Sequence, residues 1–451
     1  MTAWRRPPTR IIVPLALVLA LRAASGAEPT APSPENAAVP TPAPALSTAP
    51  AAFSPTSAPD PPKTGFARWL DPDTAPFLPI PEIDTSPSSG ITLGLIPVLL
   101  SNNAQGQIDQ ILAPDVIHSQ YFGWGARWRT FRNPTDDERW SVVGGGKQHT
   151  ESEFDAQYER GILRNGRWSW RVEAIYDRSG TDRFFGLGND SNYGNQTSYV
   201  DAQSRLEGRI GFNFNPTTQL SYMARYVNVD IENGVLPQLP STLALFPDLP
   251  GIGHQRELQS RVVLTYDTRD SAIAPTHGER LAVFAGVAEQ SIFTHPEYAY
   301  EGVDATVLAP VRRGVTIAAH AALRYMPSYA NAPFWALSAI GGDRSVLAEE
   351  QPLRAFAEGR FVDRNASSAS LEVRLSALAL HLFATDLSFE PAPFIDAGKV
   401  FNRPQSSPVT HPNIAGGLGL RMIARPYIVG YVDVGFGKDG VTVFSGIDYP
   451  F

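Results

Sequence analysis

The amino-acid sequence predicts an all-β fold, namely a closed antiparallel transmembrane β-barrel of about 16 strands with a loop folded into its interior. Three observations support this prediction. Apolar and polar residues alternate over many segments, and only 18% of the residues are charged although 10% are aromatic. No apolar run reaches the roughly 18 residues of a membrane-spanning helix. A barrel dilutes its apolar signal in this way because every second side chain faces the interior.

Composition and charge exclude several other classes of protein. The 8 Trp, 15 Tyr and 23 Phe supply far more core material than a disordered chain carries. The absence of cysteine excludes disulfide scaffolds and cysteine-ligated metal sites. With a net charge of −8, the chain lacks the basic surface expected of a nucleic-acid-binding protein. A soluble β-sandwich or a secreted β-helix remains the alternative fold.

The first 27 residues have the pattern of a secretory signal peptide. Three arginines precede an apolar stretch at 11–21, and small residues follow at 24–27. As a helix, this apolar stretch would be only about 16 Å long, which is too short to span a bilayer. Residues 1–27 are therefore predicted to direct export and to be removed.

Residues 28–78 are predicted to form a disordered Pro/Ala-rich spacer in the periplasm. Eleven prolines lie between residues 28 and 62, and proline is excluded from the interiors of helices and sheets. Such a segment behaves as a semi-rigid extended spacer of at most about 3.1 Å per residue. The barrel is then expected to occupy residues 79–451.

From about residue 79 onward the apolar pattern has a period of two. At 168–176, one face reads Trp, Trp, Val, Ala, Tyr and the other reads Ser, Arg, Glu, Ile. The same alternation recurs at 220–226, 316–325, 370–375 and 417–422. Successive side chains of a strand point to opposite faces. Each segment therefore has one face suited to lipid and one suited to a polar barrel interior.

The connections and the last strand indicate the bacterial outer membrane. Long polar connections such as 188–197 alternate with tight turns such as 438–440, as in outer-membrane barrels. Gly446 has no side chain to pack and Pro450 has no N–H for the ladder, so both weaken pairing of the last strand. One face of this strand is apolar and ends on an aromatic residue, through Val443, Ile447, Tyr449 and Phe451.

Four further stretches resemble the BamA/TamA (bacterial surface antigen) family of outer-membrane barrels. They are Tyr-Asp-Thr-Arg-Asp at 266–270, the stretch 353–365, Phe-Ile-Asp-Ala-Gly at 394–398 and Phe-Gly-Leu-Gly-Asn-Asp at 185–190. The stretch 353–356 is similar to the family's hydrophobic-Arg-Gly-aromatic motif on an inward-folded loop, with Ala355 at the glycine position. The resemblance extends over 79–451, and the terminal Phe resembles the signal recognised by the barrel-assembly machinery.

This resemblance implies a clasp inside the barrel and a seam at its end. Arg354 on the inward loop would bind Glu372 and Asp396 through charge-assisted hydrogen bonds. Phe356 and Gly398 belong to the same loop and late-strand motifs. In the alternative interpretation, Arg354 is a solvated loop residue. In the family, the terminal strand is the side that can open towards lipid, which here comprises Val443, Gly446, Ile447, Tyr449, Pro450 and Phe451.

The function implied is outer-membrane biogenesis, by insertion or translocation of an unfolded protein or lipid client at a weak seam. The family's insertases carry periplasmic POTRA modules ahead of the barrel, whereas here the spacer is expected in that place. Two other functions stay open: a passive or loop-gated pore, and a structural surface barrel. The expected partners are outer-membrane lipid, the barrel-assembly machinery and a client, with no nucleic acid, and the chain is expected to be a monomer.

Enzyme motifs give no support for catalysis. There is no Gly-x-Ser-x-Gly elbow and no His-Glu-x-x-His. The segment 435–440 matches Gly-x-Gly-x-x-Gly, but it lies in a hairpin between two alternating segments with no following helix. We therefore predict no catalytic residues, no metal and no cofactor.

Overall fold

The computed structural model describes most of the predicted barrel region. The described residues are 77–84, 90–102, 108–271, 274–289, 297–329, 331–342, 353–382, 385–403, 407–424 and 428–447. The predicted signal peptide and nearly all of the spacer lie outside these residues, as do Tyr449, Pro450 and Phe451. The first described strand begins at Phe77, just ahead of the predicted start of the barrel at 79.

The described residues form one sheet of 21 strands and a second sheet of two short strands. The first half of the chain contains β1 (Phe77–Asp84), β2 (Thr92–Asn102), β3 (Ile108–Leu112), β4 (Asp115–Ser119), β5 (Gly123–Thr135), β6 (Glu138–Lys147), β7 (Ser152–Arg160), β8 (Trp168–Ser179), β9 (Arg183–Phe184), β10 (Thr197–Asn215) and β11 (Thr218–Asn233). Two short helical turns interrupt this order: η1 (Tyr193–Asn195) precedes β10, and α3 (Thr242–Leu245) follows β11.

The second half continues with the same strand-rich pattern. It contains β12 (Gly253–Asp267), β13 (Gly278–Glu289), β14 (Tyr298–Arg312), β15 (Val315–Ser328), η2 (Phe334–Ala336), β16 (Ser338–Ile340), β17 (Phe361–Asp363), β18 (Asn365–Leu375), β19 (Leu378–Leu382), β20 (Thr385–Phe401), β21 (Asn413–Ala424), β22 (Ile428–Gly437) and β23 (Gly440–Ile447). No described helix has the length and apolar character needed to cross a membrane. The predicted all-β class is therefore confirmed.

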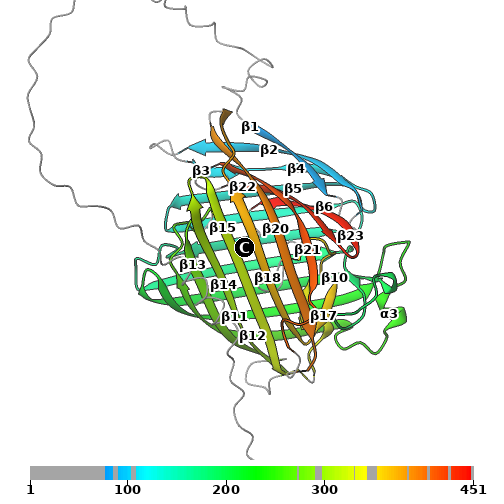
Figure 1. Cartoon of the computed structure of the whole chain (residues 1–451). Helices are drawn as coiled ribbons and strands as arrows, with labels where there is room; N and C mark the ends of the chain where they lie inside the picture. The colour runs from blue at the N-terminus through cyan, green and yellow to red at the C-terminus, as the bar shows by residue number, and fades with distance from the viewer. Residues whose placement is uncertain are drawn as a thin grey trace, which may run out of the picture. The chain divides into compact units, whose positions relative to one another are not determined.

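The large sheet is an antiparallel meander in which most strands pair with the next strand along the chain. In Figure 1, β15, β18, β20 and β21 run side by side. Strands β3 and β4 both pair with β2 and with β5, and β18 and β19 both pair with β20. In each of these two pairs, the two short strands together make one interrupted passage across the sheet. The chain therefore passes across the sheet fewer than 21 times. The predicted number of about 16 and the closure of the barrel stay predictions.

The two faces of the sheet are inverted relative to a protein with an apolar core. Large apolar side chains are exposed on one face; Trp168, for example, is 56% exposed and Leu206 is 57% exposed. Charged side chains are buried on the other, where Glu207 is 2% exposed. Charged residues are almost never fully buried unless they are paired. The alternation predicted from sequence thus places an apolar face outward and a polar face inward.

The long connections gather at one end of the sheet. They join β8 to β10, β11 to β12, β15 to β18 and β20 to β21. Because successive strands of the meander run in opposite directions, these four connections leave from the same end. Short turns such as those after β10 and β14 lie at the opposite end. The connection between β15 and β18 carries β16 and β17, and it supplies the inward loop described next.

Candidate functional site

The inward loop is the part of the connection between β15 and β18 that includes residues 353–360. It is based on the small sheet of β16 and β17, in which Ile340 pairs with Phe361. Gly341 and Gly342 follow β16 with φ values of 128° and 91°, a backbone region that glycine adopts without steric cost. The amide of Leu353 then donates to the Gly342 carbonyl at 2.9 Å. These contacts fix the base of the loop.

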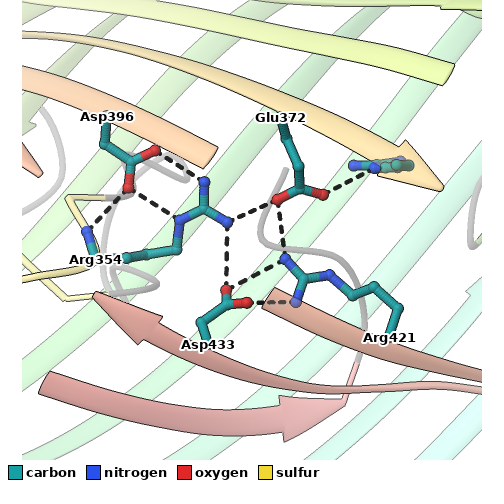
Figure 2. Close-up of polar contacts among 6 residues, drawn as sticks. Arg354, Glu372, Asp396, Arg421 and Asp433 are labelled. Carbon is teal, nitrogen blue, oxygen red and sulfur yellow. Dashed lines mark hydrogen bonds and ion pairs between the residues drawn. The ribbon is translucent and has the colours of Figure 1, made fainter. Parts of the chain in front are cut away.

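Arg354 lies at the centre of the site and is fully buried. Its Nε and Nη2 donate to the two carboxylate oxygens of Asp396 on β20, at 2.9 and 2.8 Å. Its backbone amide donates to the same carboxylate at 3.0 Å, and its Nη1 donates to Glu372 on β18 at 2.7 Å. The structure therefore brings together the three charged residues of the predicted clasp (Figure 2).

Three further charged residues, none of them predicted from the sequence as members of the site, complete this network. Nη1 of Arg354 also donates to Asp433 on β22 at 3.2 Å. Arg421 on β21 donates to Glu372 at 2.9 Å and also to Asp433. Arg374 on β18 donates to the other oxygen of Glu372 at 2.9 Å. We call these six residues the clasp: Arg354, Glu372, Arg374, Asp396, Arg421 and Asp433.

The clasp is electrically balanced, because it contains three arginines and three carboxylates. Taking an ion out of water costs several kcal/mol, which only close pairing and additional hydrogen bonds offset. Burial alone lowers the pKa of Arg354, but Asp396, Glu372 and Asp433 raise it above its ordinary value. The guanidinium therefore stays charged inside the protein. The central carbon of this guanidinium, Cζ, lies 3.6 Å from the centroid of the Phe394 ring, which is a cation–π geometry.

Small residues on the neighbouring strands make room for the loop. A Cβ at Gly435 of β22 would overlap the Arg354 carbonyl oxygen, and one at Gly398 of β20 would lie 2.9 Å from Ile340. Phe356 is 1% exposed and packs edge-on against the Phe361 ring at 5.2 Å. The predicted residues Phe356, on the loop, and Gly398, on β20, thus belong to the packing beside the charged clasp.

Ala355, at the position where the family has glycine, is accommodated by a glycine on the facing strand. It is 1% exposed, and it lies outside the set of residues with positive φ. A Cβ at Gly437 of β22 would lie 2.9 Å from the Ala355 side chain. In the family motif, a glycine on the loop leaves room for close packing. Here the loop carries Ala355, and the room comes from Gly437 on β22.

A second arginine ties the same loop to two other connections. Arg360 is 1% exposed and its Nε donates to Asp439, in the turn between β22 and β23, at 2.6 Å. Its Nη1 and Nη2 donate to the hydroxyl and the carbonyl of Ser191 at 2.7 and 2.8 Å. The guanidinium also lies 4.7 Å from the Phe185 ring. The family resemblance is carried in part by 353–365 and 185–190. That resemblance was the only feature of the sequence that could have indicated this contact.

The predicted seam is only partly described. Val443, Gly446 and Ile447 belong to β23, which pairs with β22, and Gly446 stands opposite Tyr431. Tyr449, Pro450 and Phe451 lie outside the described residues. Among the described residues, β23 pairs with β22 and β1 pairs with β2, and Cα atoms of β1 and β23 come within 8 Å of each other. We use the word seam for the facing outer edges of β1 and β23.

Two prolines remove hydrogen-bond donors from the outer edge of β1. Pro79 stands opposite Pro97 and Pro81 opposite Leu95. In an antiparallel ladder, alternate residue pairs exchange both N–H groups, and proline has none. The hydrogen bonds between β1 and β2 must therefore come from the intervening pairs, such as Ile80 with Ile96. The nitrogens of Pro79 and Pro81 consequently face the seam, where they cannot donate.

Within the described ranges, no group of three or more His, Asp or Glu side chains could hold a metal ion. The carboxylates of the clasp are already neutralised by arginine. The chemistry that this arrangement supports is thus electrostatic anchoring of a loop.

A family comparison agrees with the motifs and the fold. The profile of the Omp85 superfamily domain matches residues 139–424, which is more than half of the chain. The chain therefore belongs to the Omp85 superfamily. This match confirms the family recognition made from sequence. Proteins of this superfamily are barrels of the bacterial outer membrane.

Solved structures with a similar fold include barrels from three bacteria. BamA from Haemophilus ducreyi lacking POTRA domains 1–3 is 13% identical, with 78% of this chain and 74% of that chain covered and a TM-score of 0.47. CdiB from Escherichia coli is 12% identical, with coverage of 83% and 62% and a TM-score of 0.46. CdiB from Acinetobacter baumannii is 12% identical, with coverage of 83% and 59% and a TM-score of 0.40. No relative is found among curated protein sequences.

Proposed function

We propose that this chain inserts or translocates a protein client, or a lipid, at the seam in the outer membrane, with the spacer in the periplasm. The observation that carries the proposal is the donor-poor outer edge of β1. An unsatisfied backbone group in hydrocarbon costs several kcal/mol. A seam with missing donors is therefore the weakest line of pairing in the wall, and an incoming strand can compete for it by β-augmentation.

The clasp supports this proposal because it anchors only one side of the terminal hairpin. Asp433 on β22 belongs to the clasp, and Asp439 in the following turn binds Arg360. Strand β23 is thus held through β22 and the turn, while its other edge faces the seam. We expect the wall to open at the seam and the loop to keep its place. This action needs no covalent chemistry, so we propose that the protein is not an enzyme.

Cysteine cross-links can test whether the seam must open. The natural chain has no cysteine, so an introduced pair can form a disulfide without competition. One cysteine is placed in turn along β1 (Phe77–Asp84) and the other along β23 (Gly440–Ile447), and pairs that oxidise efficiently are kept. Each purified protein is reconstituted in liposomes and supplied with an unfolded outer-membrane barrel. Client insertion is followed by heat-modifiable gel mobility.

We expect an oxidised seam to reduce client insertion several-fold and a reductant to restore it. The matched control is Val434→Cys with Val443→Cys, two residues that already face each other between β22 and β23, and oxidation should leave its activity unchanged. Equal insertion by the oxidised and reduced seam would contradict the proposal. A steady large conductance of the wild type in planar bilayers, without insertion, would favour the pore instead.

A further inference from the structure

A cavity of about 190 Å³ lies in the interior, apart from the clasp. One part of its lining is basic and comes from five strands: Arg183 on β9, Arg205 on β10, Arg225 on β11, Arg261 on β12 and Arg324 on β15. The other part is aromatic: Tyr199, Tyr298, Tyr300, Phe334 and Trp335. Glu358, which also lines the cavity, is exposed, so the cavity reaches solvent there. The lining therefore combines positive charge with an apolar surface.

Arg205 is the most unusual residue of this lining. It is only 7% exposed, yet its guanidinium forms no hydrogen bond or ion pair with any described residue, and its Nε is buried without a partner. The reason lies in the strand register. Arg205 stands opposite Ile175 on β8 and Val227 on β11, and neither side chain can accept a hydrogen bond. Glu173, Asp177 and Glu207 attract this guanidinium electrostatically but do not bond to it. Its burial is therefore compensated only in part, which costs free energy.

Two neighbouring arginines of the lining differ from Arg205, because their guanidinium groups have hydrogen-bond acceptors. On the next strand, Arg225 donates to Glu207 at 2.8 Å from its Nε. Arg324 donates to the carbonyl oxygens of Ala336 and Leu337 at 3.1 and 3.3 Å, so its polar atoms are used, but its charge meets no carboxylate among these contacts. The basic wall thus holds more positive charge than its ion pairs neutralise.

The lining has three acidic residues, Asp182, Asp201 and Glu358, against five arginines, so they compensate this charge only in part. Asp182 lies in the connection between β8 and β9, and burial raises its pKa above the ordinary value, with Asp177 adding to the effect. A raised pKa increases the protonated, neutral fraction of this carboxyl near neutral pH. The cavity therefore stays attractive to a negative group.

Trp335 supplies a second unused donor. Trp335 is a lining residue of the cavity, and its Nε1 is buried without a hydrogen-bond partner among the described residues. An indole N–H can only donate, so it matches an acceptor such as a carboxylate or phosphate oxygen. Arg205 and Trp335 come from a strand and from η2 respectively, and the cavity brings both to one surface.

We propose that this cavity is a binding site for a small anion that bears a carboxylate or phosphate group. Arg205 supplies the charged donor, Trp335 supplies a neutral one, and the aromatic side chains contact the body of the ligand. Cavities for drug-sized ligands have volumes of about 300–1,000 Å³, so a volume near 190 Å³ suits a smaller molecule. Guanidinium groups bind such oxyanions through paired, charge-assisted hydrogen bonds.

Calorimetric titration of the purified full-length protein in detergent tests this site with two probes, inorganic phosphate and benzoate. Phosphate tests the oxyanion alone, and benzoate adds an aromatic body. We expect at least one probe to bind and Arg205→Gln to weaken that binding by about tenfold or more, because charged hydrogen bonds contribute more than neutral ones. Trp335→Phe keeps the ring, removes the N–H donor and should weaken binding several-fold.

The matched control is Arg209→Gln, because Arg209 lies on the same strand, pairs with Glu207 at 3.2 Å and does not line the cavity. Its binding should equal that of the wild type. Heat-modifiable mobility verifies folding of each variant, and if Arg205→Gln does not fold, Trp335→Phe decides the question. Absence of binding of both probes to the wild type would overturn the proposal. Equal binding by the wild type and the folded variants would also overturn it.

Discussion

The clasp and the seam lie on opposite sides of the β22–β23 hairpin, and their bonding differs in kind. In the clasp, the carboxylates of Glu372, Asp396 and Asp433 all accept hydrogen bonds from arginine, at a site with no solvent exposure. At the seam, Pro79 and Pro81 offer no backbone donor. One side of the hairpin is therefore held by several charged bonds, and the other faces a strand edge that is poor in hydrogen-bond donors.

This difference indicates where the molecule keeps its stability and where it can yield. A balanced buried ion network is strongly destabilised when one member is removed, so the clasp side resists opening. A ladder hydrogen bond contributes only about 0.5–1.5 kcal/mol net, and the seam lacks some of these bonds. The fold thus places a rigid anchor within a few strands of an edge that is poor in hydrogen-bond donors.

Arg354→Ala disrupts the clasp and has the largest expected effect on stability. It removes the cation shared by Asp396, Glu372 and Asp433, and only Arg421 and Arg374 remain to neutralise three buried carboxylates. We expect a loss of about 3–5 kcal/mol in the free energy of unfolding. The measurement is the temperature at which heat-modifiable gel mobility changes from the folded to the unfolded position.

Arg139→Ala is the control for this variant. The Arg139 side chain is 33% exposed and its Nη2 lies 2.9 Å from Glu159, whose side chain is 27% exposed. Such a solvated pair contributes about 0–1 kcal/mol. Equal transition temperatures for Arg354→Ala and Arg139→Ala would contradict the role assigned to the clasp.

The sequence predicts the strands and their faces well, because alternation is a local property. The outward face of 168–176 and the inward face of 417–422 both follow from a period of two. The contact of Arg354 with Glu372 and Asp396 was expected only through the family resemblance, since the three residues lie far apart in the sequence. Arg421 lies in the alternating segment 417–422, but alternation alone does not place it in the clasp.

The remaining members of the site depend on register and loop placement, which alternation does not determine. Asp433 reaches Arg354 because β22 pairs with β21 in one particular register. Arg360 meets Asp439 because a loop folds back over the β22–β23 turn. The donor-poor edge of β1 follows from the pairing of Pro79 with Pro97. A single sequence reveals the prolines but not which edge of the strand they face.

Gly435→Ala tests the packing of the loop against the wall, with a smaller expected effect. Its Cβ would overlap the Arg354 carbonyl oxygen, which is backbone and cannot rotate away. Overpacking of this kind costs about 1–3 kcal/mol. The control is Gly416→Ala, where the nearest atom to a Cβ is the Phe394 carbonyl oxygen at 3.8 Å. If both variants unfold at the same temperature, the close approach of loop and strand is not a determinant of stability.

Replacing both Pro79 and Pro81 with alanine tests the seam by restoring backbone donors to it. This double variant has the smallest expected effect on stability. Each substitution adds one N–H to the outer edge of β1, worth about 0.5–1.5 kcal/mol if β23 accepts it. The greater freedom of the unfolded chain offsets about 0.4–1 kcal/mol per proline, so the net change in unfolding free energy is near zero.

The effect of the double variant on hydrogen bonding between β1 and β23 is expected to exceed its effect on stability. We therefore expect slower amide hydrogen exchange in β23 and slower client insertion, with little shift in the unfolding temperature. Pro97→Ala serves as the control, because its nitrogen faces away from β1, and unchanged exchange in β23 of the double variant would contradict a donor-limited seam.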